Sequence, residues 1–210
     1  AEGLDLGDGV LIADGAAGMN TVTGTAIYLN NVDGATVDNV DVAYTLASRS
    51  GIGVDADSDS DTLIVKNVNA ANRTSGIRVS GGDDLTLTDN NLTNNTTAIQ
   101  ATSVTKNALA ASVIATGNVF TSSANGLNLS SLSAGLTIGT TGTENIVINN
   151  AASGLKTVTS TAIQLANVDN VTINGLDLAY PGASRSGIGI DSTSGVDNLL
   201  IQNLTVTNRS

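Results

Sequence analysis

The segment Ala47-Ser48-Arg49-Ser50-Gly51-Ile52-Gly53-Val54-Asp55 indicates how this chain folds, because it returns almost unchanged 136 residues later. The second occurrence reads Ala183-Ser184-Arg185-Ser186-Gly187-Ile188-Gly189-Ile190-Asp191. At the same offset, residues 25–74 and 161–210 align without a gap and share 25 identities in 50 positions. Such a repeat indicates stacked units rather than one central core. We therefore expect residues 1–210 to form one continuous domain, with a first copy over 1–136 and a partial second copy over 137–210.

A shorter and looser period lies inside this unit. A small residue followed by Ile or Leu recurs every 22–36 residues, at Ile27, Ile52, Ile77, Ile99, Leu127, Ile163 and Ile188. An Asn followed by an aliphatic residue recurs in step with it, at Asn39, Asn67, Asn91, Asn118, Asn145 and Asn203. Between the markers, apolar and polar residues alternate, which places one side of a strand inside and the other outside. The pattern predicts parallel strands wound into about seven or eight rungs, stacked about 4.8 Å apart.

The Asn marker has a physical explanation in the backbone. A sharp corner between two strands needs a residue in the left-handed region, which Gly, Asn and Asp enter at little cost. Gly175 fills this slot in one coil, which favours the backbone explanation. Stacked Asn side chains also form hydrogen-bonded ladders along a rod. We therefore predict that the Asn marker residues form a corner ladder, and that Ile27, Ile52, Ile77, Ile163 and Ile188 stack in the core.

These markers resemble those of right-handed parallel β-helix proteins, the pectate-lyase-like superfamily. The tandem-repeat regions of bacterial or archaeal surface adhesins and fibres are the most similar members. The resemblance covers nearly all 210 residues. It implies an all-β fold, a right-handed parallel β-helix with three faces per coil. Because enzymes and adhesins share this fold, function has to be argued from particular sites on it.

The composition restricts the function further. The formal net charge of −11, with only eight Lys and Arg, disfavours nucleic acid, whose binding depends on basic residues that neutralise phosphates. No apolar run reaches the roughly 18 residues of a membrane span. The absence of His removes the usual general base and the commonest transition-metal ligand. With three Tyr, one Phe and no Trp, the core is expected to consist of thin aliphatic layers.

One acidic segment is a candidate metal site. Asp55, Asp57, Asp59 and Asp61 alternate with small residues, and carboxylates that converge in a turn can bind Ca²⁺, which takes six to eight oxygen ligands. The segment lacks the Gly and Glu of an EF-hand loop, and the second copy keeps only Asp191 and Asp197 of the four acidic positions. We expect either no cofactor and a solvated acidic turn, or a structural Ca²⁺ ion.

Catalysis is the rival hypothesis. Arg49 with Asp55, and their copies Arg185 and Asp191, could serve a polysaccharide lyase or hydrolase as an Asp/Arg cleft. An Arg that packs over a coil edge is the structural alternative. Tyr44 and Tyr180 lie close by in sequence, so Tyr44, Arg49, Tyr180 and Arg185 are candidates for a surface contact, for example with glycans. The alternative for the two tyrosines, which we favour, is that they cover a loop next to the arginine.

The sequence favours a structural role without catalysis. We expect a repeat segment of a long extracellular fibre or cell-surface adhesin that acts as a stiff spacer. Position 210 corresponds to Thr74, where the first copy continues into another rung, and neither end resembles a polar cap. We therefore expect end-to-end self-association or continuation within a longer chain.

Overall fold

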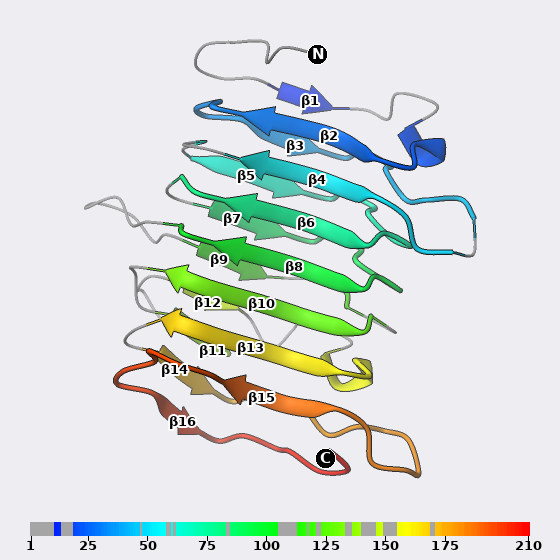
Figure 1. Ribbon diagram of the computed structural model, residues 1–210. Coiled ribbons are helices and arrows are strands. Elements are labelled where there is room, and N and C mark those ends of the chain that lie inside the picture. Colours follow the sequence, from blue (N-terminus) through cyan, green and yellow to red (C-terminus); the bar gives the residue numbers. More distant parts are fainter. Residues whose placement is uncertain are drawn as a thin grey trace.

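The structure is a computed structural model. It describes residues 11–13, 19–46, 48–57, 60, 62–82, 85–104, 113–116, 118–120, 123–132, 136–139, 146–148, 155–168 and 171–210. The chain winds into a right-handed parallel β-helix, with β1 (Leu11–Ala13) and β16 (Leu200–Gln202) at opposite ends of the stack (Figure 1). The predicted fold class is confirmed.

Two parallel sheets run along the rod (Figure 1). Along the seven-stranded sheet the strands are β2 (Thr25–Asn30), β4 (Ile52–Asp57), β6 (Ser75–Ser80), β8 (Thr97–Thr102), β10 (Asn125–Leu132), β13 (Thr161–Val168) and β15 (Ile188–Ser192). Along the nine-stranded sheet they are β1, β3 (Thr36–Asp38), β5 (Leu63–Lys66), β7 (Leu85–Thr88), β9 (Val113–Thr116), β12 (Ile146–Ile148), β11 (Leu136–Gly139), β14 (Val171–Asn174) and β16. In the part of the chain that the structure describes, a third side of the coil is joined by isolated parallel bridges, which run from Asp41 through Asn69 and Asn91 to Val119, and from Asp177 to Thr205.

One part of the aliphatic core is a column of side chains in the register of the seven-stranded sheet. The column consists of Ile27, Val54, Ile77, Ile99, Leu127, Ile163 and Ile190. The expectation that Ile52 and Ile188 belong to it is wrong, because both are two positions out of register. In the segment Gly51-Ile52-Gly53-Val54 each Gly precedes an aliphatic residue, so the sequence marker fits two registers. The strand pairing shows that Val54, and not Ile52, belongs to the core column.

The small residue of the marker makes room for the third side of the coil. A Cβ atom added at Gly53 would lie 2.8 Å from the Cβ of Ala70 and 3.3 Å from a methyl group of Val42. At Gly76 the added atom would lie 2.9 Å from a methyl group of Leu92. The distances of 2.8 and 2.9 Å are too short for close-packed carbon atoms. The small residue of the marker is therefore needed where the seven-stranded sheet packs against the bridged side.

The 136-residue repeat is also a repeat in space. The 3-10 helices η1 (Met19–Thr21) and η2 (Leu155–Thr157) occupy equivalent positions in the two copies. From β2 to its copy β13 there are five strand-to-strand steps, so one unit advances the rod by about 24 Å. The copies differ in the nine-stranded sheet, where β1 pairs directly with β3 but β11 separates β12 from β14.

Candidate functional site

The predicted left-handed corner exists at three of the six Asn marker positions. Asn39, Asn67 and Asn203 have φ angles of 55°, 52° and 50°, and Gly175 fills the same slot with 68°. The side chain of Asn67 donates to Asp38 Oδ1 at 2.8 Å, and the Asn203 side chain makes the equivalent bond to Asn174 at 2.9 Å. The hydrogen bond from Asn67 is also the main cause that lowers the pKa of Asp38. The corner residues thus bond along the rod.

Two other Asn markers occupy different slots, which corrects the prediction of a single ladder. In the Asp89-Asn90-Asn91 run the left-handed residue is Asp89, with a φ of 55°. Asn91 lies two positions after this corner residue, is exposed, and donates to Asn69 at 2.9 Å. Asn118 is fully buried and bonds to the buried side chain of Asn90 at 2.9 Å. Asn145 lies outside the described residues.

The left-handed corner can be tested by substitutions at Asn67. Asn67→Leu should destabilise the rod by about 1–2 kcal/mol, because a left-handed Leu is strained by that amount. Asn67→Gly should cost less than about 0.5 kcal/mol, since glycine enters this region freely. Denaturant unfolding of both variants tests the explanation. Equal losses would show that the side-chain hydrogen bond, rather than the backbone conformation, stabilises the corner.

The most elaborate polar site on the rod is a buried arginine that the sequence analysis missed. Arg73 is fully buried and donates only to backbone carbonyls in the described contacts of its guanidinium. Its acceptors are Val42 O at 2.6 Å, Val22 O at 2.6 Å, Met19 O at 2.9 Å and Ser50 O at 3.3 Å. Because these oxygens belong to the coils before its own, the side chain ties successive rungs together. We call this arrangement the arginine clasp.

The second copy contains the same clasp. Arg209, the counterpart of Arg73, donates to Val158 O at 2.6 Å, Leu178 O at 2.9 Å and Ser186 O at 3.2 Å. Two further bonds reach Leu155 O and Lys156 O in η2, each at 3.0 Å. Burial lowers the pKa of both guanidinium groups. The only sequence signal for the clasp is that this arginine is identical in the two copies.

Each clasp is covered by a tyrosine. The guanidinium carbon of Arg73 lies 5.6 Å from the centre of the Tyr44 ring, and that of Arg209 lies 5.4 Å from the Tyr180 ring. These distances are in the range of cation–π attraction. Tyr44 is only 6% exposed, so the expectation of a surface contact there is wrong. Tyr180 is partly buried in the same role.

The two motif arginines have other roles than the clasp. Arg49 is partly buried and bonds to Asn94, through Nε to the backbone oxygen at 2.8 Å and through Nη2 to Oδ1 at 3.0 Å. Arg185 is exposed and remains a candidate for a surface contact. The expected pair of Arg49 with Asp55 is not formed, because Asp55 binds Arg78 instead.

The repeated motif is explained by its backbone. Gly51 and Gly187 have φ angles of 64° and 60°, and an added Cβ would collide with the backbone oxygens of Gly24 and Ser160. The hydroxyl of Ser50 donates to Thr23 O at 3.0 Å. Ser186 makes the same bond to Thr159 O at 3.0 Å. The motif therefore closes a tight corner onto the preceding coil in both copies.

The acidic segment is divided between a strand and residues whose placement is not described. Asp55 and Asp57 lie on β4 instead of in a turn, and Asp55 is 2% exposed. Both oxygens of Asp55 accept from Arg78, at 2.8 Å and 2.6 Å. Asp59 and Asp61 lie outside the described residues, and within the described part no group of three or more acidic side chains could hold a metal ion. Ca²⁺ binding therefore stays a prediction, with Asp55 already neutralised by an arginine.

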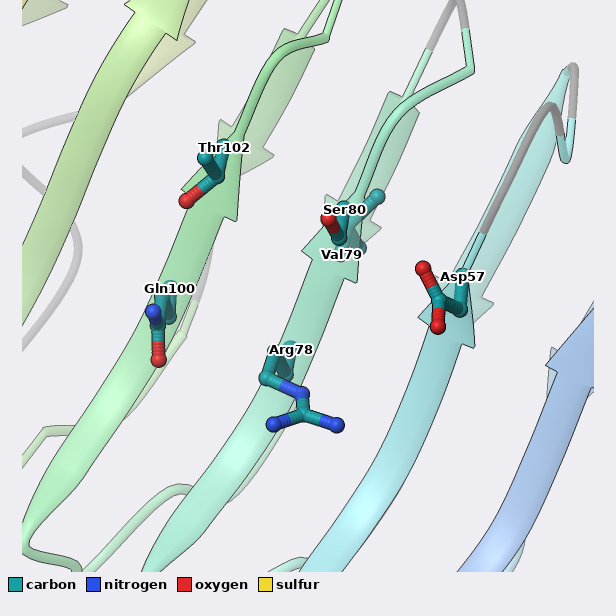
Figure 2. Close-up of a pocket in the computed structure, with 6 residues that line it drawn as sticks. All are labelled: Asp57, Arg78, Val79, Ser80, Gln100 and Thr102. Carbon is teal, nitrogen blue, oxygen red and sulfur yellow. The ribbon is translucent and has the colours of Figure 1, made fainter.

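A polar cavity of about 280 Å³ opens on the outer face of the seven-stranded sheet (Figure 2). It is lined by Asp57 from β4, by residues 78–80 of β6, and by Gln100 and Thr102 from β8. Figure 2 shows the side chains of Asp57, Arg78 and Gln100 on the same face of these neighbouring strands. None of these positions except Asp57 was singled out in the sequence.

The two stacked sheets, the bridged third side and the corner ladders define the class of protein as a right-handed parallel β-helix. Residues 25–203 match the family described as right handed beta helix region, and the chain belongs to this family. No curated protein matches the sequence.

Among solved structures, the chain is similar to the surface protein and adhesin PfbA of Streptococcus pneumoniae, with a TM-score of 0.41 and 13% identity. The match covers 97% of this chain and 64% of that one, so this chain spans less than two thirds of the length of PfbA.

None of the helices in the described residues has the length and apolar character needed to span a membrane.

Proposed function

We propose that this chain is a repeat segment of a stiff rod displayed outside the cell or on its surface, where it acts as a spacer and carries contact sites. The observation that supports this most is the recurrence of the arginine clasp after 136 residues, at closely similar distances. An arginine that bonds to the coils before its own, and recurs along the chain, stiffens a solenoid. The reason is that each coil of a solenoid otherwise contacts only the coils directly before and after it.

The rod also has an edge that suits continued stacking. On the last coil, Leu200 is 51% exposed, Ile201 44% and Val206 42%. The first-copy counterparts of the last two, Val65 and Ala70, are fully buried by the next coil. We propose that a further coil covers this edge, from a longer chain or from a second molecule, because bare edges and apolar side chains favour association.

The spacer function predicts that length follows the repeat number. A chain with one additional 136-residue unit should have a maximum dimension larger by about 24 Å and an unchanged cross-section. Small-angle X-ray scattering of both chains measures this increase. A longer chain that keeps the same maximum dimension would contradict a continuous rod.

The location needs a separate test. Antibodies against this chain should label intact cells of the source organism. Labelling that requires permeabilised cells would contradict display at the surface.

The absence of catalysis is tested by incubation with neutral and acidic polysaccharides, which should release no products. If products were released, and if the double variant Arg49→Ala with Arg185→Ala abolished their release, the lyase or hydrolase hypothesis would be favoured instead.

A further inference from the structure

We infer that the outer face of the seven-stranded sheet carries a binding site for a neutral saccharide, formed by Arg78, Asp57 and Gln100 with Tyr28 at its rim. The inference deepens the proposed function, because it assumes a rod that is displayed where it meets glycans. The cavity of about 280 Å³ is just below the size of sites for drug-sized ligands. It therefore suits a small polar ring.

The central group of this site is fixed in advance. The side chain of Asp55 is buried beneath its neighbours and holds Arg78 through Nε at 2.8 Å and through Nη2 at 2.6 Å. Those two nitrogens form one edge of the planar guanidinium, so Nη1 lies at the other edge and keeps its donors for a ligand. The hydrogen bonds that Arg78 donates to Asp55 also raise the pKa of Arg78. A ligand would meet an ordered donor that loses little entropy on binding.

The charge of the site favours a neutral ligand. Arg78 and Asp55 neutralise each other, and Asp57 contributes one further negative charge to the lining. A uronic acid or a sulfated sugar would be repelled by this carboxylate and by the net charge of −11. Carboxylate, guanidinium, amide and hydroxyl groups together accept from and donate to adjacent sugar hydroxyls. The amide and hydroxyl groups come from Gln100, Ser80 and Thr102.

An exposed aromatic ring stands beside these polar groups. Tyr28 on β2 is 53% exposed, and its hydroxyl donates to Asp57 Oδ2 at 3.5 Å. Desolvation and then the charge of Asp57 raise the pKa of the phenol above its ordinary value. The ring gives an apolar face against which the C–H groups of a sugar can pack.

Comparison of the two copies indicates that the fold does not need this combination. The second copy has Gln164 where the first has Tyr28, and Thr193 where the first has Asp57. Nevertheless β13 and β15 pair in the same register as β2 and β4. The clasp, in contrast, is the same in both copies. An exposed tyrosine beside a carboxylate is therefore a feature of the first copy alone, and it is not explained by folding.

The second copy also provides variants for the test. Tyr28→Gln with Asp57→Thr replaces both residues by those of the second copy, so the thermal midpoint should not change. The probes are immobilised oligosaccharides of glucose, galactose, mannose and N-acetylglucosamine, with polygalacturonate as the acidic comparison. We expect the unmodified chain to bind at least one neutral probe, and the double variant to bind it at least tenfold more weakly. Gln164→Ala, on the same face but away from the cavity, is the control and should bind normally.

Several results would overturn the inference: no binding of any neutral probe, binding of polygalacturonate alone, or equal affinity of the double variant. The failure of the proposed function is distinguishable from these results. A rod that lengthens with repeat number and labels intact cells but binds no neutral sugar contradicts only the saccharide site. A chain that binds sugar without forming a surface rod contradicts only the spacer.

Discussion

Arg73→Met is expected to destabilise the first copy by about 3–4 kcal/mol. Methionine fills similar space but leaves the carbonyl oxygens of the arginine clasp without their donor, and each buried group left unpaired costs about 1–3 kcal/mol. The removal of a buried positive charge offsets part of that loss. Tyr44 also loses the cation that it covers.

Amide hydrogen exchange is the appropriate measurement, because a solenoid can open in one region while the rest stays folded. Faster exchange should appear around Met19–Thr21 and at Ser50, and the second copy should keep its protection. Arg185→Met is the matched control, since that side chain is exposed and surface substitutions usually change stability by less than about 0.5 kcal/mol. Equal effects of the two variants would show that the clasp does not stabilise the rod.

Asn90→Val should cost about 2–4 kcal/mol, although valine occupies the aligned slot in the two preceding coils. The buried Asn90 side chain accepts from Val68 N at 3.0 Å and donates to Val65 O at 3.0 Å. Valine would leave both backbone groups buried and unpaired, at about 1–3 kcal/mol each. Asn118 would also lose its contact with the Asn90 amide at 2.9 Å.

The neighbouring asparagine provides the control. Asn91 is the same residue type on an exposed part of the same corner, and Asn91→Ala should cost less than about 1 kcal/mol. Denaturant unfolding of the two variants compares an inner and an outer ladder directly. If Asn91→Ala were as damaging as Asn90→Val, burial would not be the reason that the inner ladder matters.

The differences between the predicted and the observed corner ladder and core column concern register. Asn39, Asn67 and Asn203 were assigned correctly because one Asn stands alone at each corner. At Asp89-Asn90-Asn91, three adjacent residues can all take the left-handed conformation, and only the strand pairing shows that Asp89 does so. The same ambiguity placed Ile52 in the core column instead of Val54, because a shift of register changes which side chains face inward.

The candidate sites were harder to predict than the fold. The charged contacts of Arg73, Arg49 and Asp55 join residues 23–54 positions apart, and neither a motif nor a spacing rule brings such residues together. The sequence drew attention to Arg49 because it stands inside the repeated motif. It gave no reason to expect that Arg73 is the buried one, since an Arg with no acidic neighbour normally lies on the surface.

The fold class, the 136-residue repeat and the aliphatic core can be predicted from the amino-acid order, because they follow from periodicity, and periodicity is a local property of the chain. Which residue of each marker faces inward, which arginine is clasped, and which polar side chains meet at the outer cavity depend on tertiary contacts. The physical reason is that stacking brings together residues about one coil apart, whose contacts depend on the length of every intervening turn. A turn that is longer by one residue changes those contacts without altering the repeat that identifies the fold.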